Sequence, residues 1–171
     1  MVDAVPQPNF DRPSDDAVSG EDGLATFAAG CFWGIEQAFR AVRGVLDVEV
    51  GYTGGTVANP SYWLVSSGAT GHAEAVRIEF DPARISYDEL LEIFWGLHDP
   101  TRPRLGKRAR YRSAIFAHST EQERAARASL ASRAADSRQP VLTEIAPAAE
   151  FFRGEERHQR YLAKRGRAVV Q

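Results

Sequence analysis

LATFAAGCFWGIEQAFRAVRGVLDVEVGY, residues 24–52, contains a strand, a helix and a second strand in direct succession. The apolar run at 24–29 predicts a short strand, and the apolar residues of 31–43 recur at helical spacing. Residues 45–52 alternate between apolar and acidic side chains, which predicts a strand with one buried face. Gly44 separates the helix from the second strand, because glycine commonly follows a helix end.

The rest of the chain continues this alternation. Residues 73–80 alternate as a strand does, and residues 86–97 form an amphipathic helix that Ser86 and Glu89 cap. Further elements are predicted as short helices at 61–67 and 155–164, strands at 111–117 and 141–145, and an alanine-rich helix at 120–133. The order predicts an α+β fold: a ferredoxin-like split βαβ two-layer sandwich with extra C-terminal helices.

A chain of 171 residues is expected to form one domain, which we place at residues 24–171. Residues 1–23 are rich in acidic residues and proline, with little apolar content, so we expect a flexible acidic N-terminal tail. The 21 basic and 23 acidic side chains nearly balance, which gives no argument for nucleic-acid or membrane binding. No apolar run approaches the ~20 residues of a membrane span. With no secretory signal evident, we expect a cytoplasmic protein.

Cys31 is the single cysteine, so an intramolecular disulfide is impossible and a cysteine-based zinc site is disfavoured. It follows Gly30 at the start of the predicted helix, where unpaired N–H groups are expected to lower the pKa of a thiol. Phe32 and Trp33 come next and suit an apolar group such as a methyl thioether. The alternative is an inert cysteine among core aromatics, and the local pattern favours neither.

Glu74 shares the parity of Val76 and Ile78 in its strand, which points its carboxyl group inward. Burial would raise its pKa and make it a candidate general acid. The alternative is a strand-end glutamate that turns to solvent or pairs with an arginine. His72 has the same parity, and we expect it to hydrogen-bond backbone at the turn that precedes the strand.

Three tyrosines at strand ends or in loops, Tyr52, Tyr62 and Tyr111, are either hydroxyl donors to a substrate oxygen or half-buried packing residues. The four histidines show no metal-ligand spacing, so no metal and no bound cofactor is predicted.

Nine short motifs, taken together, resemble the A-type peptide methionine sulfoxide reductase family. They are GCFWGIE at 30–36, GYTGG at 51–55, NPSY at 59–62, GHAE at 71–74, FDP at 80–82, ISY at 85–87, HDP at 98–100, YRS at 111–113 and HQRYL at 158–162. They follow the order of the family over nearly all of residues 24–164.

The resemblance implies a thiol-dependent reduction of methionine-(S)-sulfoxide to methionine, in oxidised proteins or as the free amino acid. Cys31 matches the nucleophile, and Glu74 matches the acid that protonates the sulfoxide oxygen. Tyr62 and Tyr111 match the hydroxyls that hold this oxygen, and the Phe32–Trp33 pair matches the walls that receive the methyl group. The cysteine is left as a sulfenic acid.

The chain has no second cysteine to resolve that sulfenic acid. An external thiol is therefore required, which is thioredoxin, glutaredoxin or a low-molecular-weight thiol. A monomer is the family's usual state and is expected here.

One loop departs from the family pattern. Residues 101–110 are shortened, lack the family's aspartate and carry a basic run that includes Arg104, Arg108 and Arg110. Cations there are expected to lower the pKa of both Cys31 and Glu74. Either the loop recruits an anionic substrate or reductant, or it is a solvated surface loop.

Two other functions remain open at this point. A divergent family member could reduce another small sulfoxide, for which the changed loop is the support. The other alternative is a non-catalytic redox sensor or peptide binder. The retained cysteine, glutamate and aromatic residues argue against it.

Overall fold

The structure, a computed structural model, describes residues 21–166. Most of the predicted tail, residues 1–20, lies outside the described residues. The strands are β1 (Leu24–Ala29), β2 (Val45–Thr53), β3 (Ala73–Phe80), β4 (Ser113–Ala117), β5 (Glu144–Pro147) and β6 (Phe152–Arg153). The α-helices are α2 (Phe32–Arg40), α3 (Tyr62–Ser66), α4 (Tyr87–Gly96), α5 (Thr120–Asp136) and α6 (Tyr161–Lys164). Three short 3-10 turns are η1 (Glu21–Gly23), η2 (Gly106–Tyr111) and η3 (Glu156–His158).

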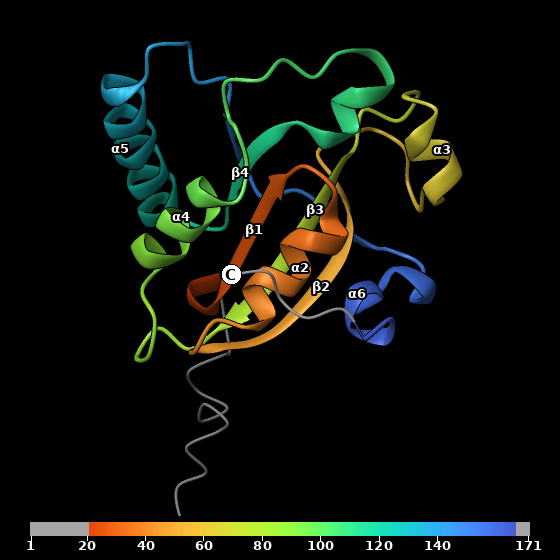
Figure 1. The fold of residues 1–171 in the computed structure, drawn as a ribbon, viewed down its shortest axis with the longest axis horizontal. Helices are drawn as coiled ribbons and strands as arrows, with labels where there is room; N and C mark the ends of the chain where they lie inside the picture. The colour runs from red at the N-terminus through yellow and green to blue at the C-terminus, as the bar shows by residue number, and fades with distance from the viewer. Residues whose placement is uncertain (1–20, 167–171) are drawn as a thin grey trace, which may run out of the picture.

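The strands form one mixed sheet in the order β5-β4-β1-β3-β2-β6 (Figure 1). The four central strands, β4-β1-β3-β2, pair antiparallel throughout, which is the arrangement of a split βαβ fold. At the edges β5 runs parallel to β4, and β6 pairs with the end of β2. The predicted fold class is therefore confirmed.

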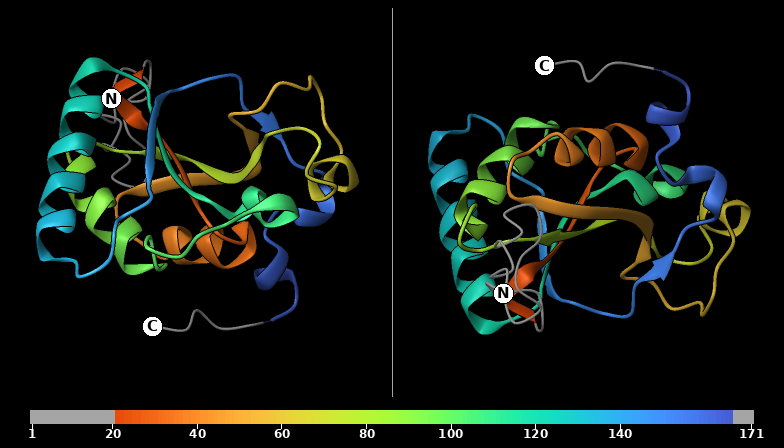
Figure 2. Two further views of the ribbon diagram at one scale, coloured as in Figure 1. Left: turned by 90° about the horizontal axis from the view of Figure 1, so that it is seen from above. Right: turned by 90° about the horizontal axis from the view of Figure 1, so that it is seen from below.

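The main core lies between the sheet and the helices α2 and α4. Phe27 of β1 stacks against Phe39 of α2 and Phe94 of α4, with ring centroids 5.7 and 5.0 Å apart. The opposite face carries small alanines and Phe116, which the chain after β5 covers. Figure 2 shows α2 and α4 on one side of the sheet and this covering segment on the other.

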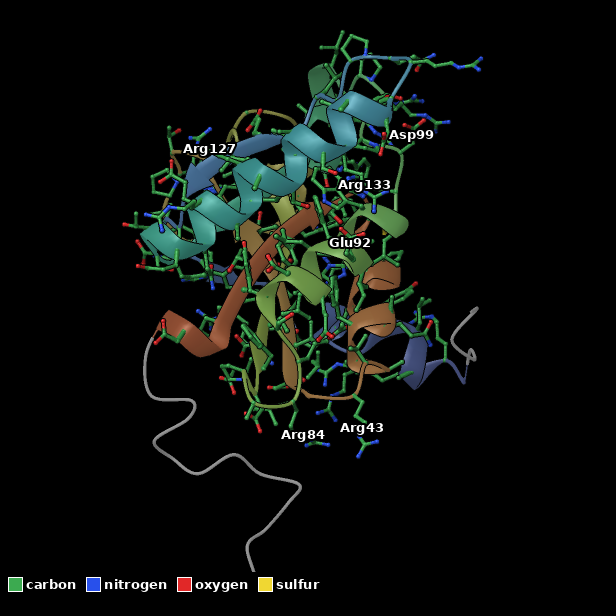
Figure 3. All side chains as sticks on the ribbon, turned by 90° about the vertical axis from the view of Figure 1, so that its left-hand side faces the viewer. Arg43, Arg84, Glu92, Asp99, Arg127 and Arg133 are labelled. Carbon is green, nitrogen blue, oxygen red and sulfur yellow. The ribbon has the colours of Figure 1, made fainter. Side chains whose placement is uncertain are left out.

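Helix α5 packs along α4. Arg133 of α5 forms an ion pair with Glu92 of α4 at 2.7 Å, as Figure 3 shows, and Trp95 donates a hydrogen bond to Ser129 at 2.7 Å. In the part of the chain that the structure describes, no helix is both long and apolar enough to cross a membrane.

Several predicted elements differ from the structure. The strand expected at 141–145 lies at Glu144–Pro147, and β6 was not predicted. The expected strand at 111–117 begins only at Ser113, because residues 106–111 form the turn η2. The expected helix at 155–164 is split into η3 and α6 by Arg160, whose φ is +52°. Here Glu36 accepts the Arg160 N–H at 2.8 Å, and the Gln159 side chain bonds to the backbone of β2. These tertiary hydrogen bonds stabilise the break between η3 and α6.

Candidate active site

Cys31 sits at the junction between β1 and α2. Gly30 ends the strand with φ +102°, a conformation that favours glycine, and Cys31 occupies the N-cap position of the helix. The cysteine is exposed, and the backbone N–H groups of Trp33 and Gly34 lie close enough to its sulfur to favour the thiolate. The junction thus presents a sulfur at the positive end of a helix, as the sequence predicts.

The pKa of Cys31 nevertheless moves the other way from the prediction. Although the residue is exposed, the protein atoms around the sulfur desolvate it and raise its pKa, and the nearby Glu74 carboxyl group raises it further. The backbone N–H groups of Trp33 and Gly34 and the charge of Arg110 lower it, but they do not compensate. The expectation of a lowered pKa was therefore wrong, because desolvation outweighs the helix terminus.

Glu74 points to the helix side of the sheet, as its parity predicts. It lies near the start of β3 with 1% of its surface exposed, and Oε1 accepts the Phe32 N–H at 3.3 Å. Desolvation raises its pKa to about 7, against the opposing effects of this hydrogen bond and of Arg110. Because Phe32 directly follows Cys31, the hydrogen bond fixes the carboxyl group close to Cys31.

Arg110 is a site residue that the sequence did not single out. It turns inward from η2, and its Nε lies 3.6 Å from Glu74 Oε2. The guanidinium is held by hydrogen bonds to the Ser66 and Lys107 carbonyls and to the Tyr111 hydroxyl, at 2.9, 3.0 and 2.9 Å. The Arg110 Nε atom itself is buried without a hydrogen-bond partner among the described residues. The loop's expected pKa-lowering effect on Cys31 and Glu74 thus comes from Arg110, although burial outweighs it.

Tyr111, the last residue of η2, lies near both Glu74 and Tyr62. Both tyrosines are half-buried. Burial raises the pKa of Tyr111, and the nearby Glu74 and Tyr62 raise it further. Tyr62 begins α3, whose N-cap is Ser61. The structure therefore brings both predicted hydroxyl-bearing residues to the same place as the acid.

Phe32 and Trp33 form the start of an aromatic cluster with the C-terminal segment. Phe32 is buried, whereas Trp33 is partly exposed and stacks on Tyr161 with ring centroids 3.7 Å apart. The Trp33 indole donates to His158 Nδ1 at 3.1 Å, and the His158 ring lies against Tyr62 with centroids 4.5 Å apart. The roles of His158 and Tyr161 went unassigned in the sequence, although both stand in the HQRYL motif.

Glu155 links Tyr52 and Tyr62 through its carboxylate, and no sequence signal marked it. Its carboxylate accepts the Tyr52 hydroxyl at 2.9 Å and the Tyr62 N–H at 3.0 Å. Burial opposes its charge, but these hydrogen bonds prevail and hold the pKa of Glu155 below its usual range. Tyr52 is fully buried, so its hydroxyl serves this bond and packing.

His72 bonds backbone on both ring nitrogens. Nδ1 accepts the Gly55 N–H at 2.9 Å, and Nε2 lies 2.7 Å from the Val57 carbonyl. A Cβ at Gly55 would meet the Thr70 carbonyl oxygen at 2.3 Å, so this close approach requires glycine. His72 therefore holds the loop around Gly55 by bonding to its backbone, as the sequence predicts.

Comparison with known proteins gives concordant matches. The family model described as "Peptide methionine sulfoxide reductase" matches residues 23–171. A protein of Methanoculleus marisnigri called peptide methionine sulfoxide reductase MsrA is 53% identical over 147 residues, which cover 83% of this chain and 90% of that protein. Peptide methionine sulfoxide reductase A3 of Arabidopsis thaliana is 46% identical over 95% of this chain and 82% of its own length.

Solved structures agree with the sequence matches. The reduced form of Mxr1 from Saccharomyces cerevisiae superposes with a TM-score of 0.79 at 32% identity, covering 86% of this chain and 87% of that one. Methionine sulfoxide reductase A of Corynebacterium diphtheriae gives a TM-score of 0.75 at 32% identity, covering 86% and 77%. Mxr1 in complex with Trx2 matches with a TM-score of 0.59 at 27% identity, covering 79% and 82%.

Proposed function

The chain belongs to the peptide methionine sulfoxide reductase family, and from this premise we propose how its own residues reduce methionine sulfoxide to methionine. The sulfoxide sulfur lies against Cys31, and its methyl group contacts Phe32 and Trp33. The sulfoxide oxygen points to Glu74 and to the hydroxyls of Tyr62 and Tyr111. Three different groups on a chiral sulfur then meet three different walls, which selects one epimer, the S form.

Glu74 supplies the proton in this scheme. With a pKa of about 7, its carboxyl group is partly protonated at neutral pH and can donate to the sulfoxide oxygen. Protonation of Glu74 also removes the negative charge that disfavours the Cys31 thiolate, so an acid and a nucleophile in these two states support each other.

The chemical step transfers oxygen from one sulfur to the other. The Cys31 thiolate attacks the sulfoxide sulfur and forms an S–S bond while Glu74 protonates the oxygen. The protonated oxygen then passes to the Cys31 sulfur as the S–S bond and the S–O bond of the substrate break. The substrate leaves as methionine, and Cys31 is oxidised to the sulfenic acid. Tyr62 and Tyr111 stabilise the oxygen during transfer by hydrogen bonding.

A thiol from outside the chain returns Cys31 to its reduced form. The chain has one cysteine, and the structure of the related Mxr1 with Trx2 supports a thiol reductant as partner. The candidates are thioredoxin, glutaredoxin and a low-molecular-weight thiol. The single cysteine fits a reducing compartment, and we propose the cytoplasm as the location and a monomer as the working form.

The hydrogen bond from the Phe32 N–H to Glu74 carries the proposal, because it joins the acid to the residue after the nucleophile. The test is reduction of blocked methionine sulfoxide, with the S and R epimers assayed separately, dithiothreitol as reductant and Cys31→Ser as the control. We expect turnover of the S epimer alone and none in the control. Turnover of the R epimer, or activity that survives in Cys31→Ser, would overturn the proposal.

A further inference from the structure

A groove borders Cys31, and Glu74 does not line it. This groove has a volume of about 580 Å³ and lies among α2, the end of α4, the loop that follows α4, and α6. The residues that line it include Cys31, Asp99, Arg102 and Arg104. Of the proposed sulfoxide-binding residues, only Cys31 lines the groove.

The groove has an excess of positive charge. Arg102 and Arg104 form no ion pair with an acid within residues 21–166. Its acidic member, Asp99, is engaged by the N–H and hydroxyl of Thr101 at 3.0 and 2.6 Å. His98 also lines the groove, but burial lowers its pKa, and its ring nitrogens bond the Phe94 carbonyl and Ser113. Arg102 also lowers the pKa of Asp99, so the two arginines and this one carboxylate leave the groove with one excess positive charge.

The sulfenic acid left on Cys31 requires attack in line with its S–O bond. In the proposed reaction the oxygen lies toward Glu74, so a thiol must approach the sulfur from the opposite side. The groove is open to solvent and includes Cys31 but not Glu74, Tyr62 or Tyr111, so a thiol in it can contact the sulfur outside the proposed sulfoxide site. Its volume lies within the range of small-molecule sites, about 300–1,000 Å³, and a peptide-sized thiol falls in that range.

We propose that this groove binds a low-molecular-weight thiol that bears carboxylates, with Arg102 and Arg104 holding the carboxylates while the thiol attacks Cys31. This inference rests on the proposed function, because it needs the sulfenic acid. The thiolate of the small molecule attacks the Cys31 sulfur, the hydroxyl leaves with a proton as water, and a mixed disulfide forms. A second molecule of thiol attacks that disulfide, releases the Cys31 thiolate and leaves as the oxidised dimer.

The test is steady-state reduction of blocked methionine-(S)-sulfoxide by the full chain with two thiols. Glutathione carries two carboxylates, and 2-mercaptoethanol carries none. In the double variant Arg102→Ala/Arg104→Ala we expect KM for glutathione to rise several-fold, up to about thirtyfold, since each of two exposed pairs contributes up to about 1 kcal/mol. Turnover with 2-mercaptoethanol should not change. In the parent chain, glutathione diethyl ester, whose carboxylates are blocked, should have a higher KM than glutathione.

A matched control removes two cations from the exposed part of the same loop. Lys107→Ala/Arg108→Ala should leave KM for both thiols unchanged, because neither residue lines the groove. Equal loss in the two double variants would mean general electrostatic attraction and would overturn the proposal. Unchanged KM for glutathione in Arg102→Ala/Arg104→Ala, or loss of turnover only when thioredoxin is the reductant, would also overturn it.

A single turnover without any thiol separates the oxidation of Cys31 by the sulfoxide from its later reduction by a thiol. Methionine formed in this turnover by Arg102→Ala/Arg104→Ala, at the parent rate, locates the defect in the reductive half. Absence of methionine in the parent chain itself would refute the proposed function, and the groove proposal with it.

Discussion

Arg110 Nε lies 3.6 Å from Glu74 Oε2, so one residue of the basic loop reaches the buried carboxyl group that we propose as the acid. The hydrogen bonds of its guanidinium to Ser66 and Tyr111 hold it there. A cation at this distance stabilises the ionised form of Glu74 and of Cys31 alike. Arg110 therefore lowers the pKa of the proposed acid and of the proposed nucleophile alike.

Removal of the Arg110 charge should move the pH profile to higher pH. Arg110 lowers the pKa of both Glu74 and Cys31, so in Arg110→Ala both values rise and both limbs of the kcat/KM profile shift upward. The measurement is kcat/KM against pH for blocked methionine-(S)-sulfoxide.

Three variants distinguish the charge of Arg110 from its hydrogen bonds. Arg110→Gln removes the charge and should shift the profile as Arg110→Ala does, whereas Arg110→Lys should shift it little. Arg108→Ala, in the exposed part of the loop, should leave it in place. A profile that stays fixed or moves to lower pH in Arg110→Gln would contradict the assignment.

Glu74 should make the protein less stable as the pH rises. Its pKa is about 7 in the folded chain against an ordinary 4.5, so between these values the folded state binds the extra proton. Stability should fall by about 3 kcal/mol from pH 4.5 to pH 7, since each pKa unit corresponds to about 1.4 kcal/mol. Glu74→Gln should remove this slope and lose activity by about 10²-fold or more.

Urea unfolding at pH 5 and pH 8 checks the stability part of this prediction. The difference in unfolding free energy between Glu74→Gln and the parent should grow in favour of the variant at pH 8. A constant difference at the two pH values would show that Glu74 titrates normally in the folded chain.

Strands β1, β2 and β3 and helix α4 were predictable because their signals are local. Alternation with a period of two placed Glu74 on the helix side of β3, and it is buried there. The capping box of Ser86 and Glu89 forms as the sequence predicts, and α4 begins at the next residue. In each case the residues that decide the structure stand within one element.

What the sequence missed depends on distant contacts. Arg110 looks like one of several cations in an exposed loop, and its inward direction comes from the Ser66 carbonyl, 44 positions earlier. The pKa of Cys31 was predicted from its own helix, whereas the desolvation that prevails comes from other parts of the fold. The break at Arg160 depends on Glu36, 124 positions away.

The hydroxyls of Tyr62 and Tyr111 should matter for kcat. Tyr62→Phe and Tyr111→Phe each remove a proposed donor to the sulfoxide oxygen, and loss of one such donor typically costs about 10²-fold in kcat. The effects should appear in kcat with the fold unchanged by circular dichroism. Two variants with parental kcat would assign both tyrosines to packing.

Tyr161 should support the methyl-binding wall through Trp33. The two rings stack with centroids 3.7 Å apart, and such a pair contributes about 0.5–1.5 kcal/mol. Tyr161→Ala should raise KM about two- to tenfold with little change in kcat, and Tyr161→Phe, which keeps the ring, should not. A fall in kcat with unchanged KM would contradict a role limited to positioning Trp33.

The central claim is that Cys31 takes the oxygen of methionine sulfoxide. It is tested by mixing the fully reduced chain with excess blocked methionine-(S)-sulfoxide and no thiol, then measuring methionine and the mass of the peptide that contains Cys31. We predict one methionine per chain, loss of the single free thiol and one added oxygen on Cys31. Methionine formed without oxidation of Cys31, or no methionine from a folded chain with a reactive thiol, would contradict the account.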